Sequence, residues 1–527
     1  MNKFLTSKSL HFSIAIIVAI FTTGFLRLQL FTALPGTDGG LYTFVAQYIH
    51  HTLGNGEDLK FMTLNFYQML TYWVYGLEVN QIILLRIIDG LIAIVASIFL
   101  FKVILKESGS KLFTVILMFP LLILMNDIEV IAYGYRNSIW AAYIPLFAAL
   151  LIWQKSSNTD KFSFYIIGAL ISLGVLLREP FLPFFLLLGV AITVAYGWRI
   201  FLKYLIGATI LGSSVLAFAL MLRGWDLIDL INSYLKLASG LNEQRGGVTG
   251  SSDFILKMFI SSGAKFLQKN WFIVCTALAS AIYLIQLYSV DKKLVSMNRF
   301  YFWILISLIP IIEPMVKLGF EYHFAQSLPG LAGLSAMGWR YLNSNQSKKV
   351  VMSSVLILSL ASLIVVGKMV KRSIINSDYI YTPSIALKLI SMPDMFRGAQ
   401  TIERSQYLII ARKIYELTKE DSTLAVFANM AILYPLTELL PPTYELSSLN
   451  AFYTNQNLDN KKLIKAIKNN RPTIIAIPKD IDLLAAKNLT DIIKKTNLYK
   501  KVMVVPKNPA INYGWKSIKI YRLKDFK

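Results

Sequence analysis

The sequence contains a single cysteine, Cys275, which lies inside an apolar run. One thiol supports neither an intramolecular disulfide framework nor a metal site built from several cysteines. Charged residues are also scarce: they account for 16% of the 527 positions, whereas soluble globular domains carry about 25%. These shortages exclude a disulfide-based scaffold and argue against an ordinary soluble protein.

Hydrophobic residues are abundant instead, at 55% of the chain, with a mean hydropathy of +0.54. This composition predicts a polytopic membrane protein that is stabilised by helix packing. The net charge is +23, but much of the Lys and Arg lies beside hydrophobic segments or in the last third of the chain. We therefore expect these charges to attract anionic membrane lipid and not nucleic acid.

Long apolar segments predict about eleven membrane spans. The first runs from about Leu10 to Thr32 behind Lys3 and Lys8, and we interpret it as an uncleaved first helix. The other spans are expected at about 79–105, 111–126, 138–153, 162–178, 180–197, 201–222, 271–290, 300–318, 323–341 and 349–368.

Lys and Arg concentrate in alternate connections between these spans, and such connections remain in the cytoplasm. The N-terminus is then cytoplasmic, and the segment after the first span, the loop at 223–270 and everything after Lys368 lie on the outer face of the cytoplasmic membrane.

The hydrophobic runs shorten after about Lys371, where a soluble region begins. Amphipathic helices are expected at Lys461–Asn469 and Ile481–Thr496. Short strands are expected at Ser422–Ala428, Thr473–Ile477, Lys501–Val505 and Ser517–Tyr521. This alternation predicts a small α/β domain. The fold is thus expected to be mainly α, with a transmembrane helix bundle at 1–370 and an extracytoplasmic α/β domain at 371–527.

One acidic residue, Asp38, directly follows the first span. Pro35 and Gly36 end the helix, and the glycines at 39 and 40 allow the backbone to turn closely around the carboxylate. Apolar residues then recur at helical spacing, which predicts an amphipathic helix on the bilayer surface. These residues are Leu41, Phe44, Val45, Tyr48 and Ile49.

Further ionisable residues are expected on the outer face. Asp127, Glu129 and Arg136 lie in one connection, where they either assist at a phosphate or hydroxyl group or cap helix ends in solvent. Arg178 ends a span and either binds a lipid phosphate through its guanidinium or pairs with Glu179. His323 begins a span and either faces the phosphate or makes a helix-end hydrogen bond.

Other polar and aromatic residues lie in or near the membrane. Arg86 and Asp89 are three positions apart and are expected to form an ion pair on one helix face. Arg27 is expected to extend outward to the level of Asp38. The aromatic stretch from Phe61 to Tyr75 is typical of a membrane-interface belt.

Two motifs carry a family resemblance: Pro35–Tyr42, which opens the surface helix after the first span, and Glu321–Ala332 near the last spans. With many spans and a C-terminal outer domain, this arrangement resembles the GT-C superfamily of integral membrane glycosyltransferases, in particular bacterial relatives of protein O-mannosyltransferases and lipid A aminoarabinose transferases. The resemblance implies that an acid of the first outer loop acts on the acceptor. Here Asp38 is followed by Gly39, where the family often has an Asp-Glu pair, so we expect one carboxylate and no metal ion or other cofactor.

Transfer of a sugar from a polyprenyl-phosphate donor needs one base, because the phosphate leaves as a stable anion without protonation. We expect Asp38 to be that base, with Arg178, Arg136 and His323 on the phosphate side and Asp127 and Glu129 as accessory acids. The acceptor is expected to be an envelope glycan, a lipid or a protein. A polytopic transporter and a non-catalytic protein for polysaccharide assembly or ligation are the alternatives.

Overall fold

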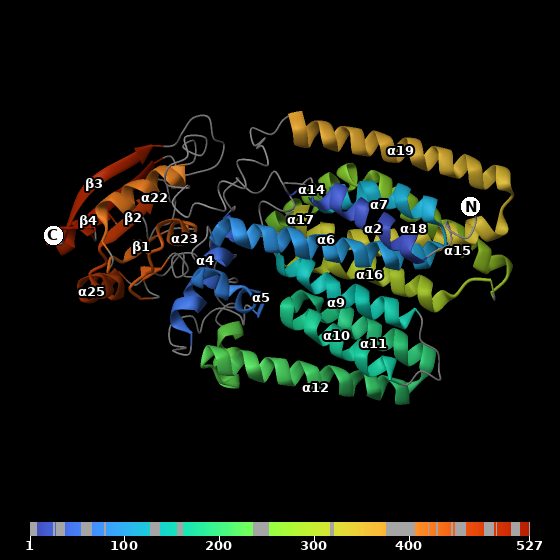
Figure 1. The fold of residues 1–527 in the computed structure, drawn as a ribbon, viewed down its shortest axis with the longest axis horizontal. Coiled ribbons are helices and arrows are strands. Elements are labelled where there is room, and N and C mark those ends of the chain that lie inside the picture. Colours follow the sequence, from blue (N-terminus) through green and yellow to red (C-terminus); the bar gives the residue numbers. More distant parts are fainter. Residues whose placement is uncertain are drawn as a thin grey trace.

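A computed structural model describes residues 8–24, 27, 37–53, 66–77, 81–126, 137–154, 162–235, 252–292, 294–316, 321–375, 406–419, 421–427, 430–443, 446–447, 460–478, 490–491, 493–506 and 517–525. In Figure 1, a bundle of long helices fills one side, and a small sheet with its own helices forms the other. The expected combination of a mainly helical chain and a small C-terminal sheet is confirmed.

The bundle contains a helix at each position where a span was expected. Its helices are α2 (Lys8–Ala19) with the π-helical turn η1 (Ile20–Gly24), α6 (Gln81–Ser108), α7 (Lys111–Met125), α9 (Asn137–Trp153), α10 (Ser163–Leu177), α11 (Leu182–Tyr196), α12 (Trp198–Arg223), α15 (Trp271–Val290), α16 (Met297–Val316), α18 (Leu328–Asn345) and α19 (Lys348–Ile375). Further elements between them are η3 (Glu179–Phe181), α14 (Ser252–Lys269), α17 (Glu321–Phe324) and η4 (Ala325–Ser327).

Among the described residues, five helical segments are long and apolar enough to cross a membrane by length and composition: Gln81–Ser108, Glu179–Tyr196, Trp198–Arg223, Trp271–Val290 and Lys348–Lys368. The described residues also form shorter apolar helices. The outermost helices expose many large apolar side chains, as α19 does with Met352, Leu356 and Leu363. Exposing such an apolar surface to water is energetically unfavourable, whereas the hydrocarbon core of a membrane accommodates it. The apolar helices therefore indicate membrane association.

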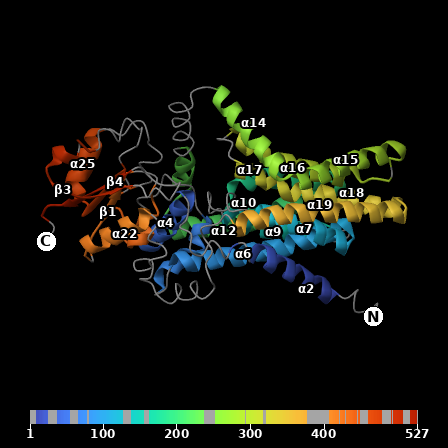
Figure 2. The same ribbon diagram turned by 90° about the horizontal axis from the view of Figure 1, so that it is seen from above.

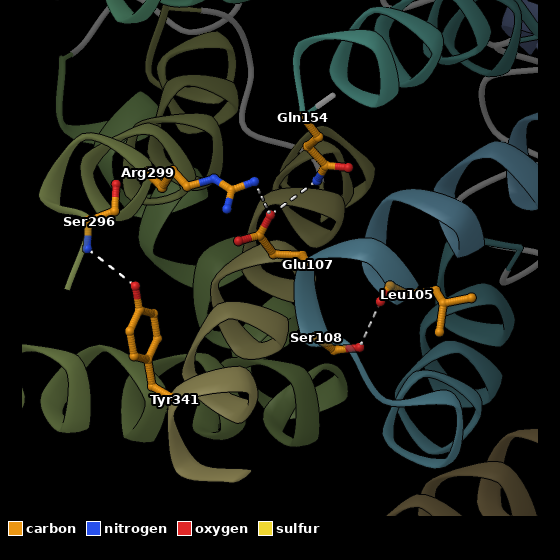
Figure 3. Close-up of polar contacts among 7 residues, drawn as sticks. All are labelled: Leu105, Glu107, Ser108, Gln154, Ser296, Arg299 and Tyr341. Carbon is orange, nitrogen blue, oxygen red and sulfur yellow. Dashed lines mark hydrogen bonds and ion pairs between the residues drawn. The ribbon is translucent and has the colours of Figure 1, made fainter. Parts of the chain in front are cut away.

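A buried polar cluster joins three helices at the end of the bundle far from the sheet (Figures 1 and 3). The carboxylate of Glu107, at the end of α6, pairs with Arg299 of α16 at 3.3 Å. Gln154, just beyond α9, donates a hydrogen bond to the same carboxylate at 3.0 Å. Figure 3 also shows the hydroxyl of Tyr341 accepting a hydrogen bond from the backbone of Ser296. The contacts of Glu107 join α6, α9 and α16, and the separate contact of Tyr341 adds α18 at the same end.

The C-terminal sheet has the order β1-β2-β4-β3. Its strands are β1 (Leu424–Val426), β2 (Ile474–Pro478), β3 (Tyr499–Pro506) and β4 (Ser517–Leu523). β1 and β2 are parallel, and the other pairs are antiparallel. Every residue of β2 is buried, which explains its uninterrupted apolar sequence. All four expected strands are confirmed.

Helices cover the sheet. The expected helix at 461–469 is confirmed as α25 (Asn460–Asn470), whose Leu463 and Ile467 share a core with Ile475. Ile474, the preceding residue of the strand, belongs to the larger core with Ile410 of α22 (Gln406–Leu417). Of the expected helix at 481–496, only the final turn lies within the described residues.

Three further elements lie at the end of the bundle that faces the sheet: α4 (Thr37–Thr52), α5 (Phe66–Met69) and η2 (Tyr72–Gly76). α4 contacts both α5 and η2, and it also contacts α23 (Leu433–Thr437) of the C-terminal domain. In both views α4 lies between the sheet and the bundle (Figures 1 and 2). Within the described residues, this helix is therefore an element at which the two parts of the chain meet.

Candidate functional site

The candidate site is built around the start of α4. This helix begins at Thr37, so Asp38 lies in its first turn, although the side chain of Asp38 is outside the described residues. Gly39 and Gly40 continue the helix. They do not form the turn around the carboxylate that the sequence suggested. Gly40 is instead closely approached by Ile432 of the C-terminal domain.

The apolar stripe of α4 is buried in protein. The sequence had suggested instead that this stripe would face the surface of the bilayer. Its five members are each at most 6% exposed and belong to the main hydrophobic core. An apolar stripe indicates which face of a helix avoids water, but lipid and protein satisfy that requirement equally. Because α4 packs against α5, η2 and α23, its apolar stripe is covered by protein.

A cluster of buried polar side chains lies close to this helix, at the start of α6. The hydroxyl of Tyr67, on α5, donates a short hydrogen bond to the carboxylate of Asp89. Arg86, one turn earlier on α6, and Arg27 both attract this carboxylate. All four side chains are buried. The expected pair of Arg86 and Asp89 is thus part of a larger cluster, in which two cations and a tyrosine surround one acid.

Arg27 does not extend outward as expected but is buried. Its Nε donates to the side-chain oxygen of Asn126 at 2.8 Å, and its guanidinium lies over the ring of Trp140, 5.4 Å from the centroid. Asn126 also donates to the hydroxyl of Thr23 at 3.3 Å. A guanidinium with a hydrogen-bond acceptor and an aromatic face beside it gains more from these contacts than from reaching the membrane surface.

Arg178 and His323 are both buried, at 7% and 3% exposure, and a single tyrosine connects their neighbourhoods. Tyr143, on α9, places its ring 5.3 Å from that of Phe181 in η3, which directly follows Arg178. Its hydroxyl donates to the backbone carbonyl of Gln326, at 3.5 Å, just after α17 with His323. Glu179, the alternative partner of Arg178, accepts a hydrogen bond from Tyr234 at 2.8 Å.

The first turns of α9 connect this neighbourhood to the cluster around Arg27. The rings of Trp140 and Tyr143 are 6.1 Å apart and perpendicular, so that one contacts Arg27 and the other reaches Phe181. The bundle end beside α4 therefore gathers several buried cationic or imidazole side chains, and such groups stabilise a phosphate that is withdrawn from water. They include Arg27, Arg86, Arg178 and His323.

Arg136, Asp127 and Glu129 lie outside the described residues, directly after Asn126. Tyr67, Asn126 and Trp140 were not expected as site residues, because an aromatic residue in a belt or a lone Asn gives no sequence signal of a tertiary contact. Within the described part of the chain, no group of three or more His, Cys, Asp or Glu side chains could hold a metal ion.

In comparisons with known proteins, no protein-family model matches the chain and no curated protein matches it.

Proposed function

We propose that this protein is a membrane glycosyltransferase that moves a sugar from a polyprenyl-phosphate donor to an envelope glycan, lipid or protein. The observation that carries this proposal is the juxtaposition of one acid in the first turn of α4 with buried cations at the same end of the bundle. A lipid-linked phosphate needs cationic partners within an apolar body, whereas an acceptor hydroxyl needs a base. The site combines both.

In the proposed reaction, Asp38 removes the proton of an acceptor hydroxyl as the hydroxyl oxygen bonds to the anomeric carbon of the sugar. The bond between that carbon and the phosphate oxygen breaks, and polyprenyl phosphate leaves with the electron pair. Arg178 and His323 hold the departing phosphate, with Arg136 as a further partner. Because the nucleophile enters opposite to the leaving group, the anomeric configuration inverts.

The proposal includes a location. The chain crosses the cytoplasmic membrane about eleven times, with its N-terminus in the cytoplasm and both α4 and the C-terminal domain on the outer face. The end of the bundle with α4 is also the end with the C-terminal domain, which supports a single outer surface on which donor and acceptor meet (Figure 1).

An Asp38→Asn substitution tests the proposal. It removes the base but keeps the size of the side chain, so sugar transfer is expected to fall about 100-fold or more. The measurement is mass spectrometry of envelope glycans, lipids and proteins from cells that carry the wild type, the variant or no copy of the gene. The matched control is Asp491→Asn, because the side chain of Asp491 is 65% exposed in the C-terminal domain. Normal transfer by the Asp38 variant at normal protein levels would remove the assignment.

A further inference from the structure

The C-terminal domain contacts α4 two residues from Asp38. A Cβ atom added at Gly40 would lie 2.8 Å from the Cβ of Ile432 and 3.0 Å from its backbone nitrogen. Real Cβ atoms do not approach other atoms so closely, so a residue with any side chain at position 40 would displace the domain or the helix. Gly40 therefore allows the C-terminal domain to sit directly on the helix backbone.

A second contact lies one helical turn further along α4. The rings of Phe44 and Tyr434 stack with centroids 4.3 Å apart and planes inclined by 30°. Both side chains are completely buried. Tyr434 belongs to α23, which begins directly after Ile432, so both contacts come from one short segment of the C-terminal domain. We refer to residues 430–437 as the seat of α4.

The seat meets one particular face of the helix. Gly40 and Phe44 are four positions apart, so they lie on the same face, whereas position 38 is separated from position 40 by about 200° around the helix axis. The C-terminal domain therefore holds α4 from the side opposite to position 38. It fixes the rotation and tilt of the helix and leaves the face with position 38 uncovered by the seat.

We propose that the C-terminal domain is a positioning element of the active site, which acts through Ile432 and Tyr434 on Gly40 and Phe44 to orient Asp38. This inference rests on the function proposed above. A base must be held within a fraction of an ångström of the proton that it removes, and a misplacement of about 1 Å costs about 100-fold in rate. The seat gives the short helix α4 this rigidity from outside the bundle.

The first experiment measures docking without measuring activity. Ile432→Cys is introduced into full-length protein whose native cysteine is replaced by Cys275→Ser, and its labelling by a maleimide is followed. Ile432 is buried under α4, so labelling is expected to be slow. Adding Gly40→Ala is expected to raise the labelling rate about tenfold, since the new methyl group overpacks the contact. Gly367→Ala is the control, because a Cβ atom there meets nothing within 4 Å.

The second experiment measures catalysis by the same glycine variants with native Ile432. Gly40→Ala is expected to lower kcat about tenfold or more while KM for the polyprenyl-phosphate sugar stays within about twofold, because the acid acts on the acceptor and not on donor binding. Tyr434→Leu is expected to do the same, because it removes the ring that stacks on Phe44. A merely structural role would not separate kcat from KM in this way.

Each result decides one question. An unchanged labelling rate in the Gly40 variant would overturn the docking, and faster labelling with unchanged kcat would overturn the positioning role. Full transfer by Asp38→Asn would instead refute the proposed function, and the labelling result would stand on its own.

Discussion

At the scale of single residues, the buried carboxylate of Asp89 accepts a hydrogen bond from the hydroxyl of Tyr67. Tyr67→Phe removes the hydrogen bond to Asp89 without changing the ring. A hydrogen bond to a charged group contributes about 1.5–3 kcal/mol, so the variant is expected to lose about that much unfolding free energy. Denaturant titration of the purified protein in detergent measures the loss. Tyr301→Phe is the control, since Tyr301 is 55% exposed, and equal stability of the two variants would contradict the prediction.

The histidine pair at the end of α4 predicts a dependence on pH. Burial, reinforced by the charge of His50, lowers the pKa of His51 below its ordinary value of 6.5. The folded protein therefore binds fewer protons than the unfolded chain, and the contribution of His51 is complete above pH 6.5 and declines as the pH falls below it. His51→Gln is expected to show a smaller drop in Tm between pH 7 and pH 5. An identical drop in both proteins would contradict this assignment.

Helical spacing alone placed Arg86 and Asp89 on one face, because both residues belong to a single regular element. Their contacts with Tyr67 and Arg27 come from segments 22 and 62 positions away from Asp89 (89 − 67 and 89 − 27). Helical and strand periodicity in a sequence gives no signal of contacts between residues so far apart along the chain. The sequence therefore predicted the charges of the candidate site but not the side chains that surround them.

At the scale of elements, α10 and α12 cross with almost no space between their backbones. A Cβ atom at Gly168 would lie 1.9 Å from the carbonyl oxygen of Tyr204, and one at Gly207 would lie 2.0 Å from that of Tyr165. Small residues of this kind let membrane helices approach closely. Gly168→Ala is expected to cost about 1–3 kcal/mol of unfolding free energy.

The control for this crossing lies on the same helix. A Cβ atom at Gly174 would have its nearest neighbour at 3.4 Å, which is ordinary contact, so Gly174→Ala is expected to leave stability within about 0.5 kcal/mol of the wild type. Chemical denaturation of both variants measures the difference. If both variants were equally stable, the two helices would not be as close as described.

The helices and strands themselves were largely predictable, because long apolar runs and β-branched runs such as Thr473–Ile477 produce strong local signals. The error concerned α4. Its stripe correctly predicted a helix, but part of the surface that covers it comes from residues 430–437, far along the chain. Which surface buries a helix depends on tertiary contacts. The local sequence indicates only that one face of the helix is buried.

At the scale of the whole molecule, the proposed orientation predicts opposite results for reporters on the two faces. Alkaline phosphatase folds only outside the reducing cytoplasm, so its fusion after Lys527 is expected to be active and its fusion after Lys155 inactive. Green fluorescent protein at the same points is expected to give the reverse pattern. Matching signals from both fusion points would contradict the odd number of crossings that the proposal places between Lys155 and the C-terminal domain.

The stacked pair of Phe44 and Tyr434 also has a consequence for biosynthesis. The two rings are separated by 390 positions of chain (434 − 44). At about 5–20 residues per second, the ribosome needs on the order of 20–80 s to make the intervening polypeptide. During this interval the nascent α4 has been made, but its counterpart does not yet exist. The contact between α4 and residues 430–437 can therefore form only after Tyr434 has been made, and a product truncated before that residue would lack it.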